Sequence, residues 1–136
     1  VAIAADLACS ASAEIIGELR HILERQRAVP QGHNAEFLVL DEEFHRTLAL
    51  SAGRAHAWRV IESIKAQMDR IRYLSLDDAT PIPLLIKQHA RIVDAIESGD
   101  PTAAATAVRT HMQQIVQSLP DIAEKFPDMF EHRKTI

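Results

Sequence analysis

The sequence is poor in the residues on which several common classes of protein depend. It holds a single cysteine, Cys9, and can therefore form neither an internal disulfide nor a cysteine-based zinc site. Aromatic residues make up only 4% of the chain, which favours helix over sheet, because strands are enriched in aromatic and β-branched side chains. The net charge of −4 argues against a basic surface that holds nucleic acid by its phosphates.

Long hydrophobic runs are missing as well. The longest apolar runs, at 1–5 and 83–86, fall far short of the roughly 20 apolar residues that a membrane-spanning helix needs. No basic segment precedes the first run, so a signal peptide is not expected. The chain begins without Met, which suggests a fragment or a processed product. We therefore expect a cytoplasmic protein without membrane association.

What the sequence does contain is helical periodicity, and its 136 residues suit a single all-α domain. Apolar side chains, mostly Ala, Ile and Leu, recur at helical spacing between short turn signals that contain Gly or Pro. The pattern predicts helices at about 1–9, 13–28, 35–52 and 55–76, a fifth from the end of the 77–83 loop to about 98, and a sixth over 101–119. Pro120 and Pro127 interrupt the C-terminal tail, residues 120–136.

Several helix ends are marked by capping residues. Ser12 is expected to cap the second helix, and Gly53 is a natural residue just past the end of the third. Asp100 is expected to cap the sixth helix, with Pro101 in its first position.

Four ionisable residues stand where the helix pattern calls for buried apolar side chains: Asp41, His45, His89 and His111. Asp41 and His45 are four residues apart, so both lie on one face of the third helix. His89 and His111 each interrupt an apolar stripe on a later helix. The other histidines differ, because His21 has polar helical neighbours and the rest fall in or near loops and the tail. Those are His33, His56 and His132.

Four such groups on three helices indicate an interior metal site. Buried ionisable groups are usually paired or bound to metal, and one divalent ion would satisfy all four. Three imidazoles and one carboxylate suit Zn²⁺, and also Ni²⁺, Mn²⁺ or Fe²⁺. The alternative is a set of core histidines satisfied by carbonyl oxygens and an ion-paired aspartate.

Two Glu-x-x-His motifs, Glu18-x-x-His21 and Glu42-x-x-His45, match the spacing used by di-iron helical bundles. A di-iron site needs both motifs to face inward and two further interior glutamates. Glu18 and His21 lie on a polar face, and the pattern offers no other interior Glu, so we do not expect a di-iron site.

Taken together, these motifs resemble the FCD domain, the C-terminal effector-binding domain of the FadR subfamily of GntR-type bacterial transcriptional regulators. The resemblance runs from about residue 1 to residue 119. It is carried by Asp41-x-x-Phe44-His45, by Gln88-His89-x-x-Ile92-x-x-Ala95-Ile96, and by Gly99-Asp100-Pro101 with Ala104, Ala107 and Val108 leading to His111-Met112.

The resemblance implies an antiparallel bundle of about six helices, of the shorter VanR-like branch, that encloses a metal and effector cavity. It implies that Asp41, His45, His89 and His111 hold one divalent ion, most readily Zn²⁺, and that a small carboxylic acid binds beside or on it. It also implies a homodimer, and a winged helix-turn-helix domain before this one that is absent from the chain. Operator DNA would be bound only through that domain.

Two positions depart from the usual family pattern, with Gln88 in place of Glu and Arg54 in place of Asn. Neither is expected to touch the ligands. Basic and polar residues near the end of the fourth helix are candidates to contact an acidic effector. They are Arg72, Arg70, Gln67 and Tyr73.

The working hypothesis is an effector sensor in which ligand binding shifts the packing of the bundle, and with it the spacing of two DNA-binding domains. A metal-dependent hydrolase is the first alternative, because a His₃Asp site can activate water. It is disfavoured because Glu42 and Glu43 point off the face of the site, which leaves no free general base, so no catalytic residue is assigned. The second alternative is a metal-free helical interaction module.

Overall fold

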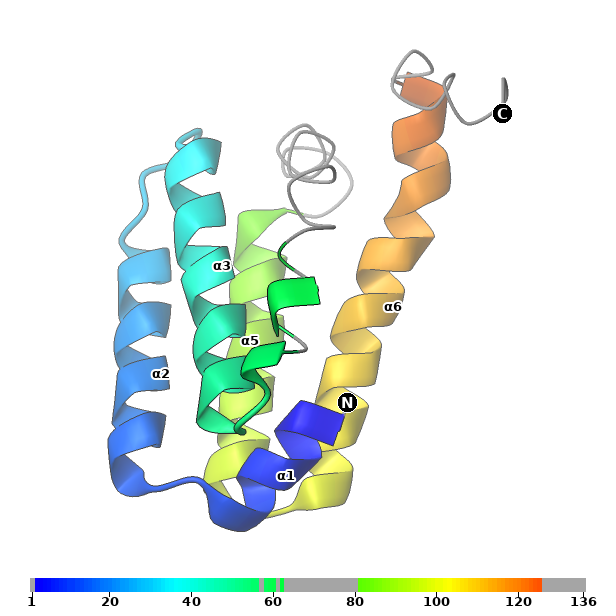
Figure 1. Ribbon diagram of the computed structural model, residues 1–136. Helices are drawn as coiled ribbons and strands as arrows, with labels where there is room; N and C mark the ends of the chain where they lie inside the picture. Colours follow the sequence, from blue (N-terminus) through cyan, green and yellow to red (C-terminus); the bar gives the residue numbers. More distant parts are fainter. Residues whose placement is uncertain (1, 57, 61, 63–80, 126–136) are drawn as a thin grey trace.

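The computed structural model describes residues 2–56, 58–60, 62 and 81–125, and every regular element in these residues is an α-helix (Figure 1). The all-α prediction is therefore confirmed. The helices with described bounds are α1 (Ala2–Ser10), α2 (Ala13–Arg27), α3 (Asn34–Ser51), α5 (Ile82–Glu97) and α6 (Pro101–Lys125). In the part of the chain described, no helix combines the length and the apolar character needed to span a membrane.

The helices pack as an antiparallel bundle. Figure 1 shows α2 and α3 as one hairpin and α5 and α6 as another, with α1 crossing the end at which α2 begins. Helix α5 lies at the centre, because it packs against α2, α6 and α1. A residue on α5 can therefore face several helices, which matters for the site described below.

The start of α2 follows from its capping residue. Ser12 has an extended backbone, and its Oγ accepts a hydrogen bond from the N–H of Ile15 at 3.3 Å, as predicted. Arg20, on the outer face of α2, reaches Asp94 at 2.7 Å and Glu97 at 3.2 Å on α5. The hydrogen bond that Arg20 donates to Asp94, followed by the one that it donates to Glu97, raises the pKa of Arg20 above its ordinary value. At this half-exposed position the pairs add little stability.

The start of α6 was also predicted correctly, but its end was not. Asp100 Oδ1 accepts a hydrogen bond from the N–H of Ala103 at 3.0 Å, and Pro101 occupies the first position. The helix then continues through Pro120 to Lys125, whereas we expected it to end at about Leu119. A proline removes only its own N–H bond and bends the helix, and the residues after it can still form theirs.

The predicted fourth helix is only partly described. Residues 55–56, 58–60 and 62 are helical, and residues 63–80 lie outside the described part of the chain. The four candidate effector contacts fall in that segment, so they stay predictions: Arg72, Arg70, Gln67 and Tyr73.

One apolar core joins all five of these helices. It contains side chains from α1, α2, α3, α5 and α6, among them Leu7, Leu23, Phe44, Ile92 and Ala104. The core therefore supplies the rigid frame on which the buried polar residues are held.

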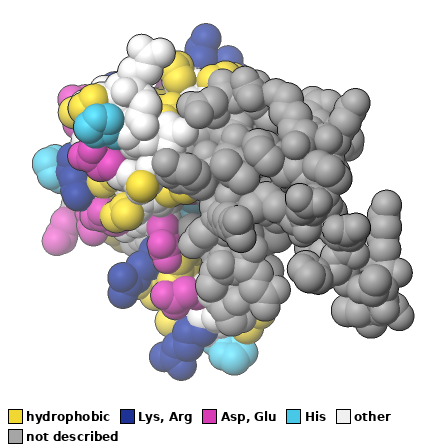
Figure 2. All heavy atoms as spheres, turned by 90° about the horizontal axis from the view of Figure 1, so that it is seen from above, with side chains coloured by type: hydrophobic (Ala, Val, Ile, Leu, Met, Phe, Trp, Pro, Cys, Tyr) yellow, Lys and Arg dark blue, Asp and Glu magenta, His cyan; other side chains and the backbone are white. Residues whose placement is uncertain are grey.

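The end of the bundle seen in Figure 2 carries charged side chains of both signs, interspersed over its described surface.

A pair of glycine substitutions tests the backbone of this frame. Gly99, just after α5, has φ +71°, a backbone conformation that side chains of L-residues rarely adopt, although an added Cβ would meet the carbonyl oxygen of Ala8 at an ordinary contact distance of 3.6 Å. Gly99→Ala should therefore lower the free energy of unfolding by about 1–2 kcal/mol. Gly17 lies within α2 with open space around it, so Gly17→Ala should raise it by up to about 1 kcal/mol. Urea unfolding measures the free energy of unfolding of both variants. Equal changes in the two would contradict the left-handed backbone at Gly99.

Candidate metal centre

Three helices bring the four predicted ligands to one place. Helix α3 carries Asp41 and His45, α5 carries His89, and α6 carries His111. Asp41, His89 and His111 are completely buried, at 0% exposure. The side chain of His45 differs from the expectation of burial, because 26% of it is exposed. The cluster is thus closed on the side of α5 and partly open at His45.

The donor atoms lie close to one another. One ring nitrogen from each of His45, His89 and His111 lies within 4.8 Å of the other two. Asp41 Oδ1 lies 3.4 Å from His45 Nε2 and 3.2 Å from His89 Nε2. Two ligand atoms at about 2.1 Å from one ion, at tetrahedral or octahedral angles, are about 3.0–3.4 Å apart. The carboxylate and these two imidazoles therefore have the spacing of neighbouring ligands on one ion.

Aromatic packing holds the imidazole rings in place. The ring of Phe44 stacks on His89, with centroids 4.4 Å apart, and meets His45 edge-on at 5.4 Å. His45 and His111 are nearly parallel at 5.5 Å, and His89 meets both of them edge-on, at 5.2 and 4.9 Å. Phe44 is completely buried, so it forms a fixed wall behind His89.

A buried glutamine on α2 fixes the tautomer of His89. Gln26 Nε2 donates to the carbonyl oxygen of Leu40 at 3.2 Å, which orients the amide so that its Oε1 faces His89 Nδ1 at 3.0 Å. An amide oxygen can only accept a hydrogen bond, so Nδ1 of His89 carries the hydrogen. In the neutral ring, Nε2 then presents a lone pair toward Asp41, as a metal ligand must.

A second glutamine performs the same function for His111. Gln88 Oε1 lies 2.6 Å from His111 Nδ1. The prediction that Gln88 does not touch the ligands was therefore wrong. Gln88 precedes His89 by one residue, so its side chain leaves α5 in a direction about 100° away from that of His89. Because α5 lies at the centre of the bundle, the side chain of Gln88 faces α6. The other departure behaves as expected, because Arg54 pairs with Asp6 at 2.7 Å instead.

Gln26 was missed altogether, although the sequence contains a signal for it. It follows Leu19 by seven residues, Ile22 by four and Leu23 by three, so it continues the apolar stripe of α2. Its exposure is 1%. Its amide is uncharged, so it does not belong to the set of misplaced ionisable residues, but a buried amide also needs hydrogen-bond partners.

The remaining histidines lie away from the cluster. His21, His33 and His56 are exposed, and His132 lies outside the described residues. Glu18 is exposed as well, so the first Glu-x-x-His motif does not face the interior. Glu43 pairs with Arg25 across the surface of α2 and α3 at 3.0 Å. These positions agree with the exclusion of a di-iron site.

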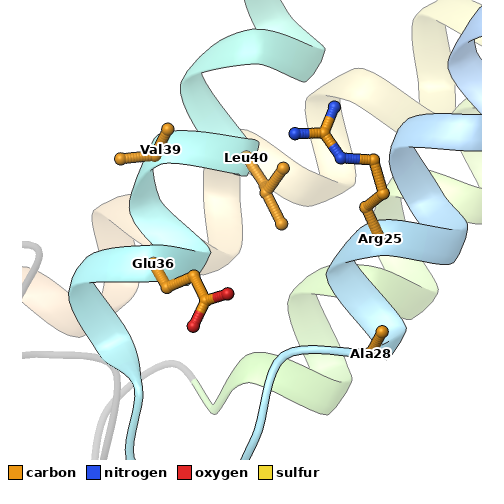
Figure 3. Close-up of a pocket in the computed structure, with 5 residues that line it drawn as sticks. All are labelled: Arg25, Ala28, Glu36, Val39 and Leu40. Atoms are coloured by element: carbon orange, nitrogen blue, oxygen red, sulfur yellow. The ribbon is translucent and has the colours of Figure 1, made fainter.

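Two cavities lie near the end of the bundle at which α2 ends and α3 begins, and the four predicted ligands line neither of them. Figure 3 shows a surface groove of about 370 Å³ between α2 and α3, lined by Arg25, Ala28, Glu36, Val39 and Leu40. A second cavity, of about 630 Å³, lies between the α2–α3 loop and the start of α5, and it includes Gln26 in its wall. The enclosed effector cavity implied by the resemblance stays a prediction.

The fold and the cluster together define a class: an all-α domain with a candidate metal centre in its interior. Residues 1–114 match the family model of the FCD domain, and the chain belongs to this family. The resemblance found in the sequence is thereby confirmed, and the domain is a regulatory one rather than an enzyme.

The curated relatives are named as transcriptional regulators. The HTH-type transcriptional repressor RspR of Escherichia coli (strain K12) is 35% identical over 114 residues, which cover 83% of this chain and 50% of that protein. An uncharacterized HTH-type regulator from an unstable DNA locus of Streptomyces ambofaciens is 34% identical over 116 residues, 85% of this chain and 49% of that protein. The chain thus spans about half the length of these relatives.

Proposed function

We propose that the chain is the effector-sensing domain of a transcriptional regulator. It binds a divalent metal through Asp41, His45, His89 and His111, and a small organic acid at or beside the metal. Binding biases the packing of the bundle and so changes the DNA affinity of a helix-turn-helix domain in the full-length protein. The observation that carries the proposal is the convergence of a carboxylate and three imidazoles from α3, α5 and α6.

The hydrogen bonds of His89 support the metal. Its Nδ1 donates to Gln26, so in the neutral ring both Nε2 and the facing Asp41 Oδ1 are acceptors, 3.2 Å apart. Two acceptors at that distance repel unless a positive charge lies between them. A divalent ion supplies that charge, and Zn²⁺ suits the donor set best, with Ni²⁺, Mn²⁺ and Fe²⁺ as alternatives.

The acidic character of the effector follows from the charge of such a centre. Asp41 supplies one negative charge, and the three imidazoles supply none when they act as ligands. A bound divalent ion would offer Lewis-acidic coordination positions to a carboxylate or hydroxyl oxygen. Arg72, Arg70, Gln67 and Tyr73, on the predicted fourth helix, remain the candidate partners of the acid.

The remainder of the proposal concerns the whole protein. We propose that the FCD domain extends to about residue 119, beyond the residues 1–114 of the family match, although α6 itself continues to Lys125. We propose a cytoplasmic homodimer whose winged-helix domains contact operator DNA, in keeping with relatives that are named HTH-type regulators and are about twice as long.

A metal-free core is the second candidate, and the short distances from Asp41 to His45 and His89 favour it. If His89 or His45 is protonated, its contact with Asp41 becomes a buried ion pair without any metal. The domain would then be a plain helical interaction module. A hydrolase is less well supported, because Glu43, next to the cluster in sequence, is paired with Arg25 on the surface.

Metal analysis of the purified domain, followed by thermal melting with and without added metal, separates these functions. With metal at about 100 times its Kd, the stabilisation is about 2.7 kcal/mol. For a domain of this size we expect the Tm to rise by roughly 5–10 °C on addition of Zn²⁺ or Ni²⁺. A domain that carries no metal and keeps its Tm would be the metal-free module, and turnover of ester, phosphoester or amide substrates would indicate an enzyme.

A further inference from the structure

The two glutamines that touch the histidines form a pair with one chemical role. Gln26 comes from α2 and Gln88 from α5, and both are buried, at 1% and 4% exposure. Each turns its amide oxygen toward the Nδ1 atom of a candidate ligand, at 3.0 Å for His89 and 2.6 Å for His111. Two independent helices therefore supply the same contact to two rings of one cluster.

This contact selects one tautomer of each imidazole. A neutral histidine can carry its hydrogen on either ring nitrogen, and only the nitrogen without it can bind metal. A buried acceptor at Nδ1 places the hydrogen there and leaves Nε2 for the ion. The amide of Gln26 cannot rotate to offer a donor instead, because its Nε2 is held by the carbonyl oxygen of Leu40.

The contact also determines the charge of the centre. Histidine ligands often donate to a carboxylate, which makes the imidazole a stronger ligand but adds a negative charge. Here both acceptors are neutral amides, so these two contacts add no negative charge to that of Asp41. A divalent ion would keep a net positive charge, and that charge attracts an anionic ligand.

We propose that Gln26 and Gln88 are positioning residues of the metal centre: they fix the Nε2-presenting tautomers of His89 and His111, and their neutrality leaves more positive charge on the bound ion, which strengthens its binding of a carboxylate. The inference rests on the proposed metal function. It adds two residues whose hydrogen bonds affect the affinity for metal and whose neutrality affects the affinity for an anion. A carboxylate at position 88 would therefore move the two affinities in opposite directions.

Substitutions at Gln88 test both parts of the proposal, the positioning of His111 and the effect of a neutral partner on anion binding. Gln88→Met removes the acceptor with little change of volume, and Zn²⁺ affinity, measured by competition with a chelator, should fall about 10–100-fold. Gln88→Glu keeps an acceptor, so Zn²⁺ should bind at least as tightly as to the unsubstituted domain. In the Co²⁺-loaded form, however, acetate titrated against the visible absorption spectrum should bind about tenfold more weakly, because of the added negative charge.

Gln113 provides the matched control. It is exposed on α6, two residues after His111. Gln113→Met and Gln113→Glu make the same chemical changes, and both Zn²⁺ and acetate affinities should stay within about twofold of the original, because a surface charge is well screened.

The tautomers can be measured without any substitution. In the Zn²⁺-loaded domain, imidazole ¹⁵N shifts should show the hydrogen of His89 and His111 on Nδ1. A hydrogen on Nε2 of either ring would overturn the tautomer assignment, even if Gln88→Met failed to fold.

The outcomes separate this inference from the proposed function. If the unsubstituted domain binds no divalent metal, the metal function itself is wrong. If it binds Zn²⁺ and Gln88→Met binds equally well, only the positioning role is wrong. Unchanged acetate affinity in Gln88→Glu would overturn the role of neutrality in anion recruitment.

Discussion

Replacing His89 by alanine should reduce the affinity for divalent metal more than about a hundredfold, beyond the loss that follows substitution of a ligand's hydrogen-bond partner. His89 connects three neighbours of the cluster: it meets Asp41 at 3.2 Å and Gln26 at 3.0 Å, and its ring stacks on Phe44. The variant removes one ligand and leaves Asp41 and Gln26 without their common partner. The Tm increase on adding Zn²⁺ should disappear with it.

The matched control is His21→Ala, on the exposed face of α2. It also removes one histidine, and so corrects for metal bound loosely at surface imidazoles. Calorimetric titration with Zn²⁺ and thermal melting of both variants give the comparison. If His89→Ala retains the Zn²⁺-dependent Tm increase of the unsubstituted domain, the cluster is not the metal site.

The fold was largely predictable because its helix ends are specified locally. Ser12, and Asp100 with Pro101, act within one helical turn, and the structure places α2 and α6 at these signals. Pro120 shows the limit of such signals. A proline disfavours a helix at one position, but whether the helix ends there depends on what the following turn gains, and the local pattern does not contain that information.

The site was predictable in part, because the face of a helix on which a residue lies is also determined locally. Helical periodicity alone placed Asp41, His89 and His111 on buried faces, and the structure buries all three completely. Periodicity gives the direction in which a side chain leaves its own helix, but not which helix lies opposite. The contacts of Gln26 with His89 and of Gln88 with His111 depend on the packing of α2, α5 and α6, and so they emerged only from the structure.

The central position of α5 explains why adjacent residues take different roles. His89 meets α3 and α2 through Asp41 and Gln26, whereas Gln88 meets α6 through His111. A small rotation of α5 would move both contacts at once. An effector that changes the geometry of the cluster would therefore act on the packing of four helices, α2, α3, α5 and α6, which is the coupling that the proposed sensing function needs.

Phe44→Ala should have the largest effect on stability. Its ring is completely buried in the core, so truncation should lower the free energy of unfolding of the metal-free domain by about 3–5 kcal/mol. The Tm should fall by about 10 °C or more. Because the ring also stacks on His89 at 4.4 Å, Zn²⁺ affinity should fall too, by about tenfold, as the imidazole gains freedom that metal binding must remove.

Leu48→Ala separates these two effects. Leu48 lies one turn later on α3 and belongs to the same core, so its truncation should cost about 2–5 kcal/mol of stability. Zn²⁺ affinity of the folded domain should then stay close to that of the original. Urea unfolding of the metal-free variants and chelator competition at low temperature measure the two quantities separately. Equal Zn²⁺ affinities in Phe44→Ala and Leu48→Ala would mean that the core stabilises the fold without positioning His89.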